Sequence, residues 1–229
     1  MDDPVPHAVS HPTISWRAGA TCVGAAGVLI PAATLLRGPF VDPHADPAAF
    51  AAWVTSKTYM PAGILFIVGL FFQMFGVLGL YQLLARGRSP RLAVTGTILT
   101  FVTDALMLVA MGVFCFTLSE IGHLYRQGHS DVLAMATSFS SSFIAFQVVQ
   151  ALTLTVGTVL TAIAISRSPE LPRWSAPAYA VSGLVIALSP PLPFLAELPA
   201  TAIYGITYVA LARCVWRASG TGARSTQPV

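Results

Sequence analysis

The chain has 229 residues, of which 55% are hydrophobic and only 9% are charged. A soluble domain carries about 25% charged residues, so this composition excludes an ordinary water-soluble protein. The formal net charge is +3, but the twelve lysines and arginines form no basic stripe, which argues against a nucleic-acid partner. The three cysteines lie in apolar stretches without CxxC spacing, and this pattern favours neither a disulfide framework nor a zinc site.

Apolar runs predict an all-α polytopic membrane protein with six transmembrane helices in one bundle. About 20 apolar residues cross a bilayer core, and helices let an open chain pair its own backbone groups there. The predicted spans are 18–36, 60–85, 92–118, 142–166, 175–191 and 194–216. The fifth is short and runs into the prolines of 189–193, which lack the amide donor of a helix. The chain therefore divides into an N-terminal tail at 1–16, a six-helix domain at 17–217 and a flexible tail at 218–229.

The basic residues predict that both termini are cytoplasmic in a multi-pass protein of the cell membrane. Lysine and arginine in short loops are retained on the cytoplasmic side. With six spans, one side of the membrane collects nine basic residues and the other collects three. The first group is Arg17, Arg86, Arg88, Arg91, Arg167, Arg173, Arg213, Arg217 and Arg224, and the second group is Arg37, Lys57 and Arg126.

The first outer loop contains FVDPHADP at 40–47, in which Asp42, His44 and Asp46 occupy alternate positions. An extended segment would send these three side chains to one side, where His123 from the other outer loop would add a ligand for a divalent metal. Alternatively, Asp42 belongs to a turn, and Asp46 before a proline is the N-cap of a short interfacial helix at 47–59. Capping accounts for most of the pattern, so we predict no metal site and no cofactor.

Asp104 lies in the middle of the third predicted span, with Thr97 and Thr100 on the same helix face. A charged residue at the centre of a membrane helix costs about 2.5 to 3.5 kcal/mol on insertion scales, so Asp104 is the strongest functional candidate. We expect its carboxyl group to point into the bundle and either to be protonated or to face a wet cavity. Its role is that of a proton carrier or general acid, or that of a structural hydrogen-bonded acid.

Other polar side chains repeat at helical spacing in three further spans. The fourth span has Gln147, Gln150, Thr153, Gly157 and Thr161, the sixth has Glu197, Thr201, Tyr204 and Tyr208, and the second has Gln73. These faces either share one polar interior or join the helices by hydrogen bonds, and Glu197 also suits the first turn of a helix. As site residues we predict Asp104 and Glu197 for catalysis, and Gln73, Thr100, Gln147, Gln150 and Tyr204 for substrate binding.

The segments LGLYQLLARGRSPRLAVTGTIL (78–99) and PELPRWSAPAYAVSGLVIAL (169–188) carry a family likeness. Through them the chain resembles small, uncharacterised six-span integral membrane proteins of actinobacteria. The resemblance covers about a fifth of the chain; it implies the topology and a plasma-membrane location, and it brings no site residues.

Two classes of function remain open. In the first, the protein is a membrane-embedded enzyme or a binding protein for a lipid or isoprenoid-like molecule. Asp104 is then the buried acid, Glu197 a carboxylate at the rim, and Gln147 and Gln150 orient the ligand. In the second, it is a small proton-linked transporter or a non-enzymatic accessory subunit, with Asp104 titrating in a homo-oligomer. The expected partners are membrane lipid and a hydrophobic small molecule.

Overall fold

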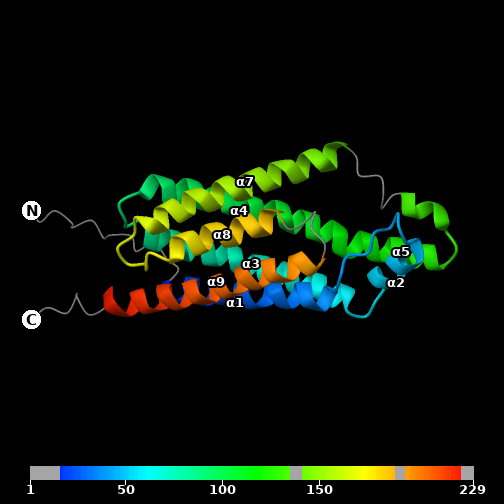
Figure 1. Ribbon diagram of the computed structural model, residues 1–229, viewed down its shortest axis with the longest axis horizontal. Coiled ribbons are helices and arrows are strands. Elements are labelled where there is room, and N and C mark those ends of the chain that lie inside the picture. The colour runs from blue at the N-terminus through cyan, green and yellow to red at the C-terminus, as the bar shows by residue number, and fades with distance from the viewer. Residues whose placement is uncertain (1–15, 135–140, 189–193, 223–229) are drawn as a thin grey trace, which may run out of the picture.

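Figure 1 shows the computed structural model, which describes residues 16–134, 141–188 and 194–222. The predicted N-terminal tail lies outside these ranges except for Trp16, and so do 189–193, Arg224 and the end of the predicted C-terminal tail. The α-helices are α1 (Trp16–Arg37), α2 (Pro47–Val54), α3 (Tyr59–Leu84), α4 (Pro90–Gly112), α5 (Leu118–Arg126), α7 (Ser141–Ser166), α8 (Ser175–Leu188) and α9 (Phe194–Gly222). A π-helix at Val113–Thr117 joins α4 to α5, and a 3-10 helix at Ser130–Val132 follows α5. Within the described ranges the fold is all-α, as predicted.

Among the described residues, five helices are long and apolar enough to cross a membrane. They are α1, α3, α7, α9 and the continuous helix that runs from α4 through α5. The protein is therefore a multi-pass membrane protein. The remaining predicted span corresponds to α8, which has only 14 residues. At 1.5 Å per residue this is about 21 Å of helix, whereas the hydrocarbon core is about 30 Å thick. By length alone, the described residues give five spans and one short apolar helix.

The helices of membrane length and α8 form a closed ring in which each helix packs against two neighbours. Around the ring, α1 contacts α3, α3 contacts α4, α4 contacts α7, α7 contacts α8, α8 contacts α9, and α9 contacts α1. The start of α1 and the end of α9 lie at the same end of the ring (Figure 1), and there the Arg17 guanidinium carbon is 5.6 Å from the centre of the Trp216 ring. The prediction of one bundle is confirmed, and its interior is where the polar side chains meet.

Small residues set the tightest helix contacts. A side chain at Gly19 of α1 would put its Cβ 2.6 Å from the Cα of Gly79 in α3. At Gly27, also in α1, a Cβ would lie 2.8 Å from the Cβ of Tyr208 in α9. Membrane helices associate through such close backbone approaches because lipid provides no hydrophobic force between them. Glycines thus hold α1 against both α3 and α9.

A helical cap extends the ring at the end away from the start of α1 and the end of α9. The helix that contains the predicted span 92–118 continues to Arg126, and its 37 residues give about 55 Å of helix, more than a bilayer core requires. The cap is formed where α2 packs on α5, and its core consists of Phe50 and Val54 of α2, Ile121 of α5, Tyr59 at the start of α3 and Leu133 after the 3-10 helix.

The predicted interfacial helix at 47–59 is shorter than expected. Asp46 is its N-cap, as predicted, because its Oδ1 accepts a hydrogen bond from the backbone N–H of Ala49 at 2.9 Å. The helix ends at Val54, since the hydroxyl of Thr55 donates to the carbonyl of Ala51 at 2.7 Å and α3 begins at Tyr59.

Candidate functional site

Asp104 faces the interior of the ring and is almost completely buried. Only 2% of its surface is exposed, and Thr97 and Thr100 on the same face of α4 are 6% and 1% exposed. One carboxylate oxygen, Oδ1, accepts a hydrogen bond from the Nε2 of Gln73 in α3 at 2.9 Å. The spacing on α4 therefore predicted the orientation of Asp104 correctly, and the structure adds its partner.

The partner is itself held in place from a third helix. The hydroxyl of Tyr204 in α9 donates to the Oε1 of Gln73 at 2.6 Å. Because an amide carries its donor and acceptor on opposite sides, this contact directs the Nε2 of Gln73 at Asp104. The polar chain Tyr204–Gln73–Asp104 thus connects α9, α3 and α4.

Aromatic rings support this chain from α8 and α9. The rings of Tyr204 and Tyr208, one helical turn apart on α9, are stacked with centroids 4.1 Å apart. Tyr179 of α8 stacks on Tyr208 at 5.9 Å. All three side chains are buried. The stack restricts the rotamer of Tyr204 and so helps to fix the direction of its hydroxyl.

Several buried polar atoms have no hydrogen-bond partner among the described residues. They are the Nε of Arg37, the Oδ2 of Asp104, the Oε1 of Gln147 and the Oγ1 of Thr161. Such atoms are rare in native structures, because each one loses its contacts with water without replacement. The first three belong to side chains that line one and the same cavity.

That cavity lies inside the ring and has a volume of about 430 Å³. The value is within the range of roughly 300 to 1,000 Å³ of small-molecule sites. Arg37, Trp53 and Glu197 line the end of the cavity that is nearer the helical cap, which we call the outer end, and Gln73, Asp104 and Tyr208 line the opposite end, which we call the inner end. The wall between them is mostly apolar and includes Ile30, Phe66, Leu70, Met107, Met111 and Phe114.

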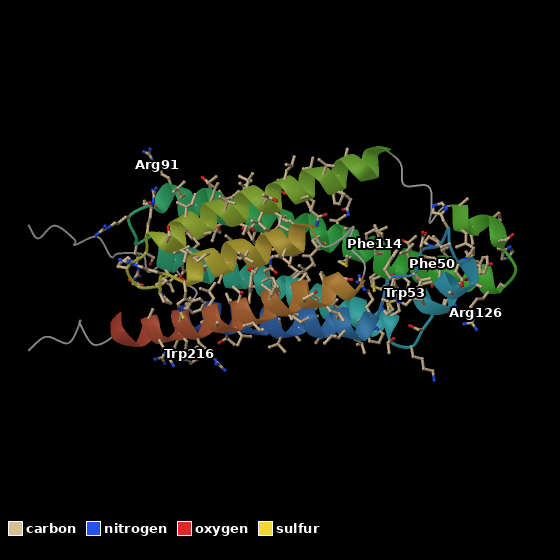
Figure 2. All side chains as sticks on the ribbon, in the orientation of Figure 1. Phe50, Trp53, Arg91, Phe114, Arg126 and Trp216 are labelled. Atoms are coloured by element: carbon tan, nitrogen blue, oxygen red, sulfur yellow. The ribbon has the colours of Figure 1, made fainter. Side chains whose placement is uncertain are left out.

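The outer end of the cavity is formed by the end of α1 and the first turn of α9. Arg37, the last residue of α1, joins these two segments by an ion pair, in which its Nη2 atom is 2.6 Å from the Oε1 of Glu197. The indole Nε1 of Trp53 donates to the backbone carbonyl of Arg37 at 2.9 Å. Edge-to-face contacts join Trp53 to Phe40 at 5.6 Å and to Tyr59 at 5.0 Å between ring centroids. Figure 2 shows Phe50 and Trp53 at this end and Arg91 and Trp216 at the opposite end.

The π-helix between α4 and α5 also borders the outer half of the cavity. Its irregular turn frees backbone groups from the regular pattern. The hydroxyl of Tyr59 donates to the carbonyl of Phe114 in this turn at 3.1 Å. Phe114 and Cys115 of the π-helix both line the cavity.

The structure brings together six of the seven predicted site residues. The cavity is lined by Gln73, Thr100, Asp104, Gln147, Glu197 and Tyr204. Gln150 is buried against α4 instead, where its Nε2 contacts the Sδ of Met107 at 3.2 Å, and it does not line the cavity. The two predicted catalytic acids lie at opposite ends: Glu197 precedes Tyr204 by seven residues, which is about 10 Å along a helix.

The rest of the polar stripe on α7 joins helices, as one of the two interpretations expected. Thr103 of α4 donates to the hydroxyl of Thr153 at 2.9 Å. A Cβ at Gly157 would lie 3.0 Å from the backbone N of Thr100, so this glycine allows α7 to approach α4 closely.

Sequence reasoning missed Arg37, Trp53, Thr103 and Tyr179 as lining residues. The sequence marks Arg37 only as one of few basic residues on its side, and no pattern in it marks Tyr179. Their proximity to Asp104 or Glu197 depends on how distant helices pack, which no local pattern carries.

The metal hypothesis for the outer loops lacks the required cluster. Among the described residues no three histidine, cysteine, aspartate or glutamate side chains come close enough to share an ion. Asp42 accepts from the backbone N–H of His44 at 2.9 Å, and Asp46 caps α2. Both aspartates therefore have the local roles that the alternative interpretation gave them.

Comparison with known proteins gives one relation. Neither the curated proteins nor the solved structures contain a match to this chain. The profile of the family described as "Domain of unknown function (DUF4386)" matches residues 18–219, a range that includes every residue lining the cavity. The chain therefore belongs to the DUF4386 family.

Proposed function

We propose that the protein crosses the membrane six times with both termini in the cytoplasm. Support comes from the charges at the two ends of the ring. Arg17, Arg86, Arg88, Arg91, Arg167, Arg173, Arg213 and Arg217 are at the end where α1 starts and α9 finishes, and Arg37, Lys57 and Arg126 are at the other. Since basic residues are retained in the cytoplasm, the capped end faces outward. On this orientation α8 is a short sixth crossing.

Within this topology, the protein binds a lipid-soluble molecule, such as a lipid or an isoprenoid-like compound, in the cavity of the ring. The observation that carries this proposal is the Oδ2 of Asp104, which is buried at the inner end of the cavity and unpaired within the described residues. A ligand hydroxyl that reaches this atom donates to it when the carboxyl group is ionised, and a ligand carbonyl or ether accepts from it when Oδ2 carries the proton.

The energetic argument favours a ligand over a purely structural role. Leaving a buried polar atom unpaired costs about 1 to 3 kcal/mol. The hydrogen bond to Gln73 satisfies Oδ1 alone. A purely structural role would therefore leave the cost of the unpaired Oδ2 uncompensated. Gln147 lines the same cavity with its Oε1 unpaired, so the cavity wall offers the ligand a second polar atom, which accepts a hydrogen bond.

This geometry supports binding more than it supports acid–base catalysis or proton transport. A general acid and base acting together must lie close to one substrate, and Glu197 is paired with Arg37 at the far end of the cavity. A proton route out of Asp104 through its hydrogen bonds would pass the amide of Gln73, which does not exchange protons as a hydroxyl or carboxyl group does.

The test is the amount of lipid that purifies with the protein, measured by native mass spectrometry on Asp104→Asn and Asp104→Leu. Asn keeps an oxygen for Gln73 and a polar atom in the cavity, so it retains much of the ligand. Leu removes both, and we expect about a tenfold loss of occupancy, equivalent to one buried hydrogen bond. Thr95→Val on the exposed face of α4 is the matched control and keeps the parental occupancy.

Each outcome decides the proposal. Retention of the same lipid at parental occupancy in folded Asp104→Leu protein overturns it. If Asp104→Leu does not fold, Asp104→Asn still tests the proposal, because a hydrogen-bonding site tolerates Asn whereas a site of proton transfer does not. Recovery of a chemically altered lipid from the parent but not from Asp104→Asn would assign an enzyme instead of a binding protein.

A further inference from the structure

The geometry points to a class of ligand, and this inference rests on the proposed function. The ligand is a single-chain lipid with an anionic headgroup, and this carboxylate or phosphate binds Arg37 at the outer end of the cavity. Its chain runs inward toward Asp104. The volume of about 430 Å³ suits one chain and a small headgroup, and a two-chain phospholipid is too large for it.

The charge of the headgroup follows from the atom at the outer end of the cavity that lacks a hydrogen-bond partner. Arg37 is the only cationic side chain that lines the cavity in the described part of the protein. Glu197 takes one bond from the NH2 group, while the Nε is buried and unpaired. The free group is thus a donor, and it requires an acceptor on the ligand. Carboxylates and phosphates match the planar fork of arginine with two parallel hydrogen bonds.

Local structure explains why α1 ends with the cationic residue Arg37, but it does not explain the direction of the Arg37 side chain. A positive charge in the last turn of a helix is favoured by the helix dipole, and Gly38 with φ of 72° ends the helix immediately afterwards. An arginine with only this role would extend into solvent. Here the Arg37 side chain is 31% exposed, its guanidinium contacts α9, and its Nε is buried.

The residues around Arg37 are typical of the membrane depth at which lipid headgroups lie. Trp53 is bonded to the Arg37 carbonyl and lines the cavity beside it. Tryptophan concentrates where membranes meet water, which is the level of headgroups in a bilayer. Below this level most of the wall is apolar down to Asp104, with Thr34 and Thr201 as polar exceptions. A chain entering here leaves its charge at Arg37 and brings its far end to the polar inner end.

The experiment uses the fluorescence of Trp53 in nanodiscs, in a background where Trp16, Trp174 and Trp216 are phenylalanine. The probes are 2-bromododecanoate, 2-bromododecyl phosphate and 2-bromododecanol, whose bromine quenches an indole that it contacts. We expect saturable quenching by the two anions that unbrominated dodecanoate reverses. Inorganic phosphate alone is the second competitor, and it distinguishes a lipid headgroup from a free anion.

Three variants separate anion binding from a structural role of the ion pair. Arg37→Gln weakens both anionic probes about tenfold and changes the alcohol by no more than about twofold. Glu197→Gln removes the competing negative charge and tightens the anionic probes. Arg126→Gln is the matched control, because it removes the same charge from the same end of the molecule without touching the cavity; it leaves all three probes within about twofold of the parent.

The results that would contradict the anionic headgroup differ from those that would contradict the proposed function. If the alcohol binds in an Asp104-dependent manner and the anions bind no more tightly, only the headgroup assignment is wrong. If Arg37→Gln and Glu197→Gln both leave the ratio of anion to alcohol unchanged, the ion pair is structural and the assignment is overturned. Protection of Trp53 by inorganic phosphate as strong as that by dodecanoate would exclude a lipid as the source of the anion.

Discussion

At the residue scale, the position of Asp104 depends on a chain of hydrogen bonds that starts two helices away. Tyr204 fixes the amide of Gln73, and Gln73 in turn occupies one oxygen of Asp104. The consequence is that the second oxygen, Oδ2, is left for the cavity. Gln73 and Tyr204, predicted as substrate-binding residues, are in this structure positioning residues for Asp104 as well as part of the cavity wall.

Removing the hydroxyl of Tyr204 tests this chain. Tyr204→Phe should lower the free energy of unfolding by about 0.6 to 1.7 kcal/mol, the range measured for hydrogen bonds between membrane helices. It should also weaken lipid retention, since Gln73 is then free to rotate away from Asp104. Thermal unfolding in detergent and native mass spectrometry measure the two effects.

The control for this substitution is Tyr81→Phe, because Tyr81 lies in α3, the helix of Gln73, and its hydroxyl makes no hydrogen bond with the described residues. It should change neither quantity. Equal effects of the two substitutions would mean that loss of a hydroxyl, and not loss of the bond to Gln73, is responsible.

The sequence identifies the unusual residues of this site but not their partners. Asp104 is conspicuous because ionisable residues are rare in apolar spans, and its helix face follows from spacing. That Gln73 meets it, rather than Gln147 or Gln150, depends on which faces of α3 and α7 turn toward α4, because α4 packs against both helices. The apolar runs do not fix the order of the helices around the ring either. Several orders are compatible with the same six apolar runs.

At the element scale, the helices follow the apolar runs because membrane insertion selects for length and hydropathy. The starts and ends of α1, α3 and α7 lie within a few residues of the predicted spans. The deviations occur outside the apolar runs, where α5 continues α4 and α2 ends early at Val54. Both are decided by packing of the cap, in which Phe50 contacts Ile121 and its neighbours.

Close contact of α1 with α3 gives a prediction at this scale. Gly19→Ala places a methyl group 2.6 Å from the Cα of Gly79, so the two backbones must separate. We expect a loss of about 1 to 3 kcal/mol, as for overpacked cores. Gly112→Ala in α4 is the control, since no atom lies within 4 Å of its added methyl group. A melting temperature for Gly19→Ala equal to that of Gly112→Ala would contradict the packing described for α1.

At the scale of the whole molecule, ring closure brings together residues that are far apart in sequence. Arg37 and Glu197 are separated by 160 positions and form the ion pair at the mouth of the cavity. Asp104 and Tyr204 are joined at its inner end through Gln73. The charge counts allowed the side of each loop to be predicted from sequence, while the cavity itself arises only when α9 packs against α1.

Cysteine labelling tests the proposed orientation. In a background in which Cys22, Cys115 and Cys214 are alanine, a membrane-impermeant maleimide is applied to intact cells. His44→Cys and Gln127→Cys should be labelled, because both sites are exposed at the capped end. Arg88→Cys, Arg173→Cys and Arg217→Cys should be labelled only after permeabilisation. Labelling of Arg173→Cys and Arg217→Cys from opposite sides would mean that α8 does not cross the membrane.

The central claim is that the ring encloses a ligand that reaches Asp104, and its most direct test is an experimental density map of the protein extracted with its native lipids. The account predicts continuous density in the cavity, beginning near Arg37 and ending within hydrogen-bond distance of the Oδ2 of Asp104. A cavity closed by rearranged side chains, or a carboxyl group of Asp104 turned outward to the acyl chains of the bilayer, would contradict it.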